Sequence, residues 1–179
     1  MSFQFPSYYS REPFFTIQPV LNTRKKQLEM WIDLVLSYCR YNKVYEIDIN
    51  EYIKKDHKLF YNEKINRRLS NESTKIIFEE MIEIGNGEWL DKDKNRVMVW
   101  WRKPEEWATL IYKWVLDSGQ TNQVLTLWEI QKGDDTKNQE FYDLDTNVLI
   151  KSLKVLEKQS KAQVFQGTDS NLGVKFFSI

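Results

Sequence analysis

Few of the side chains that could carry out catalysis occur in this sequence, and none is arranged as in a typical active site. His57 is the single histidine, so any Ser/His/Asp set would have to include it. Cys39 is the single cysteine, which excludes a cysteine-built zinc site. The polar surroundings of His57 predict an exposed loop, whereas Cys39 lies on an apolar helix face where we expect inert packing. A single cysteine also excludes an intrachain disulfide, as is usual in a reducing compartment.

Two acidic pairs are the remaining candidates for acid–base chemistry. Glu105-Glu106 follows a proline and is explained by the start of a helix, and Asp134-Asp135 is explained by a turn. No glycine-rich loop is placed to cradle phosphate. We therefore expect no enzyme activity, no metal and no cofactor, and catalysis by carboxylates alone is the one enzymatic alternative that the sequence leaves open.

Binding chemistry is more evident, above all in residues 1–19. This segment is rich in aromatic rings and is interrupted by three prolines, which predicts a polyproline-like arm that is neither a helix nor a central strand. Disordered tails are poor in aromatics, so we expect these rings to be buried somewhere. They could cover the core of their own domain, or they could fill pockets on partner proteins. The candidate partner-binding residues are Phe5, Pro6, Tyr8, Tyr9, Pro13, Phe14 and Phe15.

A second candidate surface is a row of lysines near the carboxyl end, formed by Lys151, Lys154, Lys158 and Lys161. Spacings of three and four residues place them on one helix face, opposite the leucines. Such a row is most often an ordinary solvated face, and it could also receive an acidic protein surface. Binding in a nucleic-acid groove ranks third, because no arginine or asparagine accompanies the lysines to contact bases.

The first part of the chain that positions these residues reads as three helices and a hairpin. Apolar residues at helical spacing predict a helix from about Thr23, its N-cap, to Arg40. A short extended piece is expected within 44–53. A second helix over 62–69, a third over 71–84 and a hairpin ending at Trp101 complete this part. The buried face of the first helix should contain Leu28, Trp31, Ile32, Val35 and Cys39.

The rest of the chain repeats this plan. Pro104 stops the strand and begins a helix that ends at Ser118-Gly119. Residues 123–127 are expected to form a short strand or the start of a brief helix, and 132–136 a solvated turn. A helix over 145–159 and a hairpin of 162–165 with 174–177 follow. Its inward residues should be Val148, Leu149, Leu153 and Leu156.

Three helices closed by a two-stranded wing form a winged helix, a relative of helix-turn-helix. We therefore predict an α+β, mainly helical chain of two tandem winged-helix domains, with an arm over 1–19, a first domain over 20–102 and a second over 103–179. The 26 basic and 26 acidic residues cancel, so no overall field attracts nucleic acid or an anionic membrane. The expected third helix of the first domain carries four glutamates and one lysine, which disfavours DNA binding.

Several stretches together resemble one known family. They are Pro13-Phe14-Phe15-Thr16-Ile17-Gln18-Pro19, Thr23-Arg24, Gln27-Leu28, Arg102-Lys103-Pro104-Glu105-Glu106-Trp107, Asp117-Ser118-Gly119-Gln120, Val124-Leu125-Thr126-Leu127, Gly133-Asp134-Asp135-Thr136 and Gly173-Val174-Lys175-Phe176-Phe177. The chain resembles, over nearly its whole length, the vacuolar protein sorting-associated protein 25 family, the small tandem winged-helix subunits of the ESCRT-II endosomal sorting complex.

This resemblance implies a non-catalytic subunit that enters ESCRT-II in two copies. Each copy would dock on one of the other two subunits through Pro-Pro-x-Tyr-type motifs, here Phe5-Pro6-Ser7-Tyr8 and Glu12-Pro13-Phe14-Phe15. Both motifs keep only the second proline, and the second ends in phenylalanine instead of tyrosine.

The family's second winged helix implies a further partner, the charged multivesicular body protein that nucleates ESCRT-III, and we place the lysine row in that surface. The family implies a cytoplasmic protein that is recruited to endosomal membranes without inserting into them. A winged-helix nucleic-acid binder that uses the lysine row is the alternative.

Overall fold

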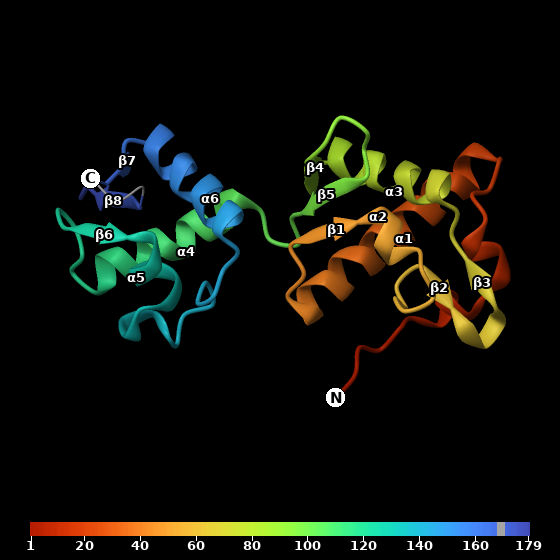
Figure 1. Cartoon of the computed structure of the whole chain (residues 1–179). Helices are drawn as coiled ribbons and strands as arrows, with labels where there is room; N and C mark the ends of the chain where they lie inside the picture. The colour runs from red at the N-terminus through yellow and green to blue at the C-terminus, as the bar shows by residue number, and fades with distance from the viewer. Residues whose placement is uncertain (168–170) are drawn as a thin grey trace. The chain divides into compact units, whose positions relative to one another are not determined.

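The computed structural model describes residues 1–167 and 171–179 and divides the chain into two compact units, Met1–Trp101 and Arg102–Ile179 (Figure 1). The boundary falls two residues before Pro104, which begins α4. Each unit contains helices and one three-stranded antiparallel sheet whose last two strands in sequence form a hairpin. This is the winged-helix plan predicted from the sequence, present twice.

In the first unit, the helices are α1 (Leu21–Asn42), α2 (Ile49–Tyr52) and α3 (Asn71–Glu83). The sheet has the order β1-β5-β4, formed by β1 (Glu46–Asp48), β4 (Gly87–Trp89) and β5 (Arg96–Val99). Central β5 pairs Val97 with Ile47 on one side and with Trp89 on the other. All five residues predicted for the inner face of the first helix are buried, which confirms that face.

Two predictions for the first unit were wrong. The N-cap of α1 is Val20 and not Thr23, so the cap lies three residues earlier than predicted, and no side chain caps the helix. Residues 62–69 form no helix: β2 (Tyr61–Asn62), a 3-10 turn over Glu63–Ile65 and β3 (Arg67–Arg68) make a small hairpin instead. Asn66 has φ of 49° and ends the turn, and an α-helix does not continue through that conformation. The short second helix of the winged-helix plan is α2.

The second unit contains α4 (Pro104–Asp117), α5 (Leu127–Lys132) and α6 (Thr146–Lys158). Its sheet, in the order β6-β8-β7, is formed by β6 (Val124–Thr126), β7 (Ala162–Gln166) and β8 (Leu172–Phe176). The sequence predicted either a short strand or the start of a brief helix at residues 123–127, and the structure has both, since β6 is followed at once by α5. The four predicted inward residues of α6 are buried. Residues 168–170, within the predicted loop of this hairpin, lie outside the described residues.

The predicted solvated turn over 132–136 is only partly solvated. A 3-10 turn covers Asp134–Thr136, and Thr136 is fully buried with its hydroxyl donating to the carbonyl of Gly133 at 3.0 Å. The two aspartates stay at the surface, and Asp134 pairs with Lys137. The turn is thus fixed to the core by its threonine, which the polar composition did not predict.

Candidate partner-docking sites

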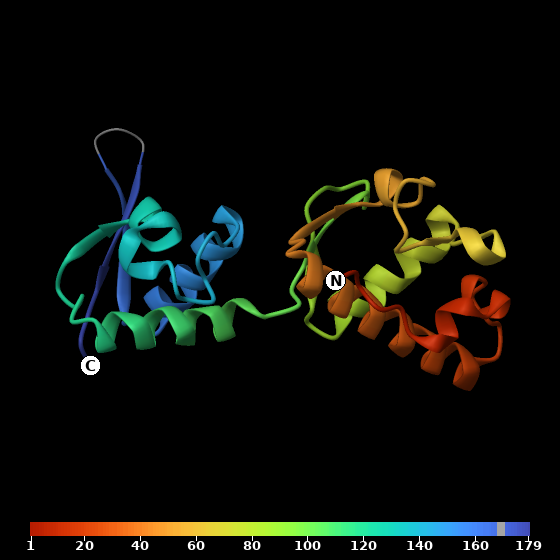
Figure 2. The same ribbon diagram turned by 90° about the horizontal axis from the view of Figure 1, so that it is seen from below.

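Residues 1–19 are part of the first unit and pack along α1 and beside the β2–β3 hairpin (Figures 1 and 2). They form two 3-10 turns, Ser7–Ser10 and Glu12–Phe15, so the prediction of a polyproline-like arm was wrong. The reason lies in the prolines. Pro6 stands just before the first turn and Pro13 in the first positions of the second, where the fixed φ of proline is compatible with the turn and its missing N–H is not needed.

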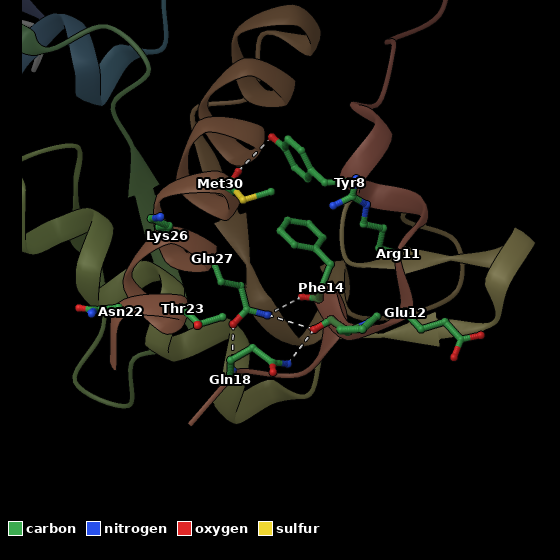
Figure 3. Close-up of a pocket in the computed structure, with 11 residues that line it drawn as sticks. Tyr8, Arg11, Glu12, Phe14, Gln18, Asn22, Thr23, Lys26, Gln27 and Met30 are labelled. Atoms are coloured by element: carbon green, nitrogen blue, oxygen red, sulfur yellow. Dashed lines mark hydrogen bonds between the residues drawn. The ribbon is translucent and has the colours of Figure 1, made fainter. Parts of the chain in front are cut away.

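Two buried side chains of α1 hold the backbone of this segment. The amide nitrogen of Gln27 lies within hydrogen-bonding distance of the carbonyls of Pro13, Phe14 and Thr16, at 3.2, 3.1 and 2.8 Å, while its oxygen accepts from the Gln18 N–H at 2.9 Å. The Trp31 indole N–H also donates to the Phe14 carbonyl, at 2.8 Å. Contacts to the main chain fix the path of the segment directly (Figure 3).

The other end of the segment is held by the loop and hairpin around residues 58–62. The Tyr9 hydroxyl lies against the carbonyls of Lys58 and Tyr61, the latter at 2.9 Å, and the buried Asn62 amide donates to the Tyr9 carbonyl at 2.8 Å. Burial raises the pKa of Tyr9, which keeps its hydroxyl protonated and able to donate. The hairpin over 61–68, which was predicted as a helix, therefore holds the N-terminal segment of residues 1–19 in place.

The structure separates the seven candidate residues of this segment into two groups. Tyr9, Phe14 and Phe15 are buried in the core of the first unit, where Phe14 stacks on Trp31 with ring centroids 4.1 Å apart. The sequence left open whether the rings cover the core of their own domain or fill pockets on a partner, and these three cover the core of their own domain. The half-buried residues Phe5, Pro6 and Tyr8 and the exposed Pro13 retain surface for a partner.

A groove of about 750 Å³ opens between this segment and α1 (Figure 3). Tyr8, Phe14 and Met30 supply apolar surface, and the Tyr8 hydroxyl donates to the Met30 carbonyl at 3.3 Å. Arg11, from between the two turns, and Lys26, from α1, also line it. The groove therefore combines an apolar lining with two cationic side chains.

The lysine row is partly on α6. Lys154 and Lys158 are exposed on its outer face and Lys151 is half-buried there, opposite the buried leucines. Lys161 is not on this helix, because α6 ends at Lys158 and Ser160, with φ of 59°, turns the chain away. Its ammonium lies 5.0 Å from the centre of the Tyr112 ring, so the prediction of four lysines on one helix face was wrong for this residue.

The carboxylate nearest to this face in sequence contacts the backbone and, in the described part of the chain, is not in an ion pair with Lys154 or Lys158. Glu157 is three residues after Lys154, close enough in sequence for an ion pair, yet its oxygen accepts the Val164 backbone N–H at 2.8 Å. Within 1–167 and 171–179, Lys154 and Lys158 have no ion pair, whereas Lys113, Lys132 and Lys137 of the same unit are paired with aspartates. The outer face of α6 is thus locally positive.

The remaining sequence candidates for chemistry are placed as follows. Cys39 is fully buried, and burial raises the pKa of its thiol. His57 is half-buried and stacks on the Tyr52 ring at 4.3 Å, so it is less exposed than predicted. Among the residues described, no group of histidine, cysteine and acidic side chains could hold a metal ion. No helix in the described ranges is long and apolar enough to span a membrane.

The sequence analysis did not identify Gln27 and Asn62, whose side chains bond the main chain of residues 1–19. Gln27 precedes Leu28 at the edge of the apolar stripe of α1 and is as buried as its neighbours, with 6% of its surface exposed. A glutamine at a buried helix position is a usable signal, because a buried amide needs hydrogen-bond partners. Asn62 carried no such signal, since its burial depends on a hairpin that the sequence did not predict.

Comparison with known proteins agrees with this architecture. The family model described as ESCRT-II complex subunit matches residues 8–145. The chain is 62% identical to vacuolar protein-sorting-associated protein 25 of Dictyostelium discoideum, over 99% of this chain and 97% of that protein. It is 46% identical to the human protein of the same name, over 99% of both chains.

Solved structures agree as well. The crystal structure of subunit VPS25 of the endosomal trafficking complex ESCRT-II superimposes with a TM-score of 0.83 and 31% identity, over 95% of this chain and 97% of that one. A chain in the crystal structure of the ESCRT-II complex of VPS22, VPS25 and VPS36 gives 0.81 and 30%, over 93% and 96%. These matches confirm the predicted tandem winged-helix fold. The chain belongs to the vacuolar protein sorting-associated protein 25 family of ESCRT-II complex subunits.

Proposed function

We propose that the chain is the non-catalytic small subunit of ESCRT-II, which docks in two copies on the other two subunits and functions in endosomal sorting to the vacuole or lysosome. The observation that carries this proposal is similarity over the full length of both chains to proteins named for vacuolar sorting, one of them crystallised in the complex. In this role the protein is cytoplasmic and is recruited to endosomal membranes by the complex, without inserting into the bilayer itself.

The docking element is the outer face of the N-terminal segment. Three of its seven candidate residues are used up in the core, so a partner meets Phe5, Pro6, Tyr8 and Pro13. Gln27 and Asn62 hold the backbone from beneath, so little conformational freedom is lost when a partner binds. The three departures from a Pro-Pro-x-Tyr pattern fall on half-buried Phe5, exposed Glu12 and Phe15, and Phe15 is buried in the core of the first unit.

The test is the mass in solution of the full-length chain mixed with the other two ESCRT-II subunits, for the intact protein and for Tyr8→Ala combined with Pro13→Ala. Deleting residues 1–19 would be a poor test, because it would also remove core rings of the first unit. Loss of one aromatic anchor from a well-packed interface costs about 2 kcal/mol or more, which is about 30-fold in affinity.

Ile84→Ala is the matched control, since Ile84 is an exposed apolar residue of the same unit, 51% accessible, and lies outside the segment. We expect a complex with two copies of the intact or control chain and a complex depleted of the double variant. Equal assembly of all three proteins would remove the segment from the interface.

The second unit offers the outer face of α6 to the charged multivesicular body protein that starts ESCRT-III assembly. Lys154 and Lys158 are exposed and form no ion pair in the described residues, so this face suits an acidic surface. Lys151 lies on the same face, and Lys161 lies beyond the helix end beside Tyr112, so only part of the predicted row contributes to this surface.

Charge reversal tests this second interface. Lys154→Glu with Lys158→Glu should weaken binding of the purified ESCRT-III subunit and make the residual binding less sensitive to salt. Lys113→Glu is the control, because Lys113 is an equally exposed lysine of the same unit, on α4. If the double variant bound as well as the control, the partner surface would lie elsewhere on the unit. Steeply salt-dependent binding of duplex DNA by the intact chain would favour the nucleic-acid alternative.

A further inference from the structure

The groove between the N-terminal segment (residues 1–19) and α1 has the features of a binding site. It is open to solvent, and its volume, about 750 Å³, falls within the range of about 300–1,000 Å³ that is typical of ligand-binding pockets. The Tyr8 and Phe14 rings meet edge to face, with centroids 4.9 Å apart, and Phe14 is backed by the stacked Trp31 ring. The apolar lining is therefore rigid, because each ring is held by another.

The groove also carries charge that the molecule itself does not neutralise. In the described part of the chain, neither Arg11 nor Lys26 forms an ion pair, and both side chains are exposed. Among the residues that line the groove, Glu12 is the one acid, and its carboxylate is bound at 3.0 Å by Arg67 of β3. Because Glu12 is paired with Arg67, it does not neutralise Arg11 and Lys26, and the groove retains these two positive charges.

We propose that this groove receives a segment of another ESCRT-II subunit that places an apolar side chain between Tyr8, Phe14 and Met30 and acidic charge beside both Arg11 and Lys26. The inference rests on the proposed docking function and specifies its chemistry. One wall of the groove is the docking segment itself, so a partner that contacts Tyr8 and Pro13 already lies at its mouth. An apolar partner without a carboxylate would desolvate two cations and leave them unpaired.

Adjacent lysines of α1 provide a matched experiment. Lys26 lines the groove and Lys25 does not, although both are exposed and their substitution changes the net charge equally. The measurement is the affinity of full-length Lys26→Glu, Arg11→Glu and Lys25→Glu for the other two subunits, with the dependence of wild-type affinity on salt concentration. Thermal unfolding should be similar for all variants, since none of these three side chains forms an ion pair with another residue of 1–167 or 171–179.

We expect Arg11→Glu and Lys26→Glu each to weaken binding at least tenfold, Lys25→Glu to have little effect, and wild-type affinity to fall as salt rises. Three equal affinities, together with loss of binding in the Tyr8→Ala and Pro13→Ala double variant, would overturn the acidic-segment inference and leave the docking function intact. Unchanged affinity in every variant, the double variant included, would overturn both. Weakening by Lys25→Glu equal to that by Lys26→Glu would indicate general charge attraction and would also overturn the inference.

Discussion

Gln27→Leu should loosen the docking segment while the rest of the first unit stays folded. Leucine has a similar size and suits a helix, so α1 and its packing should persist. What the variant loses is the set of bonds from one amide to the main chain of residues 13–18. The expected effect is a lower free energy for local opening of that segment.

The hydrogen-bond geometry gives the magnitude. The Gln27 amide nitrogen has two hydrogens to share among three carbonyls, and each of those carbonyls has a second donor, Trp31 for Phe14 and the Gln18 side chain for the other two. Two bonds of about 1 kcal/mol each are therefore lost without stranding an acceptor. The Gln18 N–H is left without a partner and adds about 1 kcal/mol. The total is about 3 kcal/mol.

Native-state hydrogen exchange of the full-length chain measures this quantity. The Thr16 amide, bonded to the Pro13 carbonyl, should exchange about 100-fold faster in the variant, while amides of β8 in the second unit keep their rates. An increase of less than tenfold at Thr16 would refute the reasoning. Equal acceleration throughout α1 and the segment would also refute it, because the loss would then be global.

Gln27→Glu adds a pH signature. The carboxylate can still accept from Gln18, but it faces three carbonyl oxygens in a buried site, which would raise its pKa above the value of about 4.3 that it has when unfolded. A raised folded pKa means that the penalty is absent below the unfolded pKa and grows as the pH rises toward the folded one. The segment of this variant should therefore open more readily at neutral pH than at pH 4, after correction for intrinsic exchange.

Three further outcomes concern the units themselves. Cys39→Ser should lower unfolding stability by about 2 kcal/mol in thermal denaturation, because a buried hydroxyl replaces a thiol, and native Cys39 should resist thiol reagents until the first unit unfolds. The Asp91 pKa, lowered chiefly by the Arg96 backbone N–H, should give a carboxyl titration in NMR with a midpoint below the usual 3.9, and the stability from this bond should persist at neutral pH and disappear as the pH falls through that midpoint. Asp145→Ala should cost the second unit about 1 kcal/mol in urea denaturation, since its side chain caps the Val148 N–H at the start of α6.

The parts of the fold that the sequence predicted are those in which local pattern and tertiary packing agree. The long helices α1, α3, α4 and α6 each bury one apolar face at helical spacing, so periodicity alone located them to within a few residues. The wings were predicted because a short β-branched and aromatic run ends at a polar turn. Errors occurred at helix ends, such as Val20, where no side-chain cap marks the boundary.

The hairpin of residues 61–68 was mispredicted because its structure is not set locally. Its two strands pair over only two residues each, too few for a period-2 pattern to appear. Its position depends on contacts with the N-terminal segment, through Asn62 to Tyr9 and Arg67 to Glu12, which are more than 50 residues apart in sequence. A window of neighbouring residues contains none of this information.

The same long-range dependence explains why sequence reasoning could list the docking residues and yet not separate them. The seven rings and prolines between residues 5 and 15 look equivalent in the sequence. Only the buried side chains that bond the main chain of the segment determine which of the seven face the core and which face solvent. Gln27, Trp31 and Asn62 bind the main chain and turn Tyr9, Phe14 and Phe15 inward, which leaves Tyr8 and Pro13 for a partner. A substitution at Gln27 should therefore weaken assembly without touching the interface, whereas Tyr8→Ala should weaken assembly both by removing surface that meets the partner and by removing the contacts of Tyr8 with Met30 and Phe14.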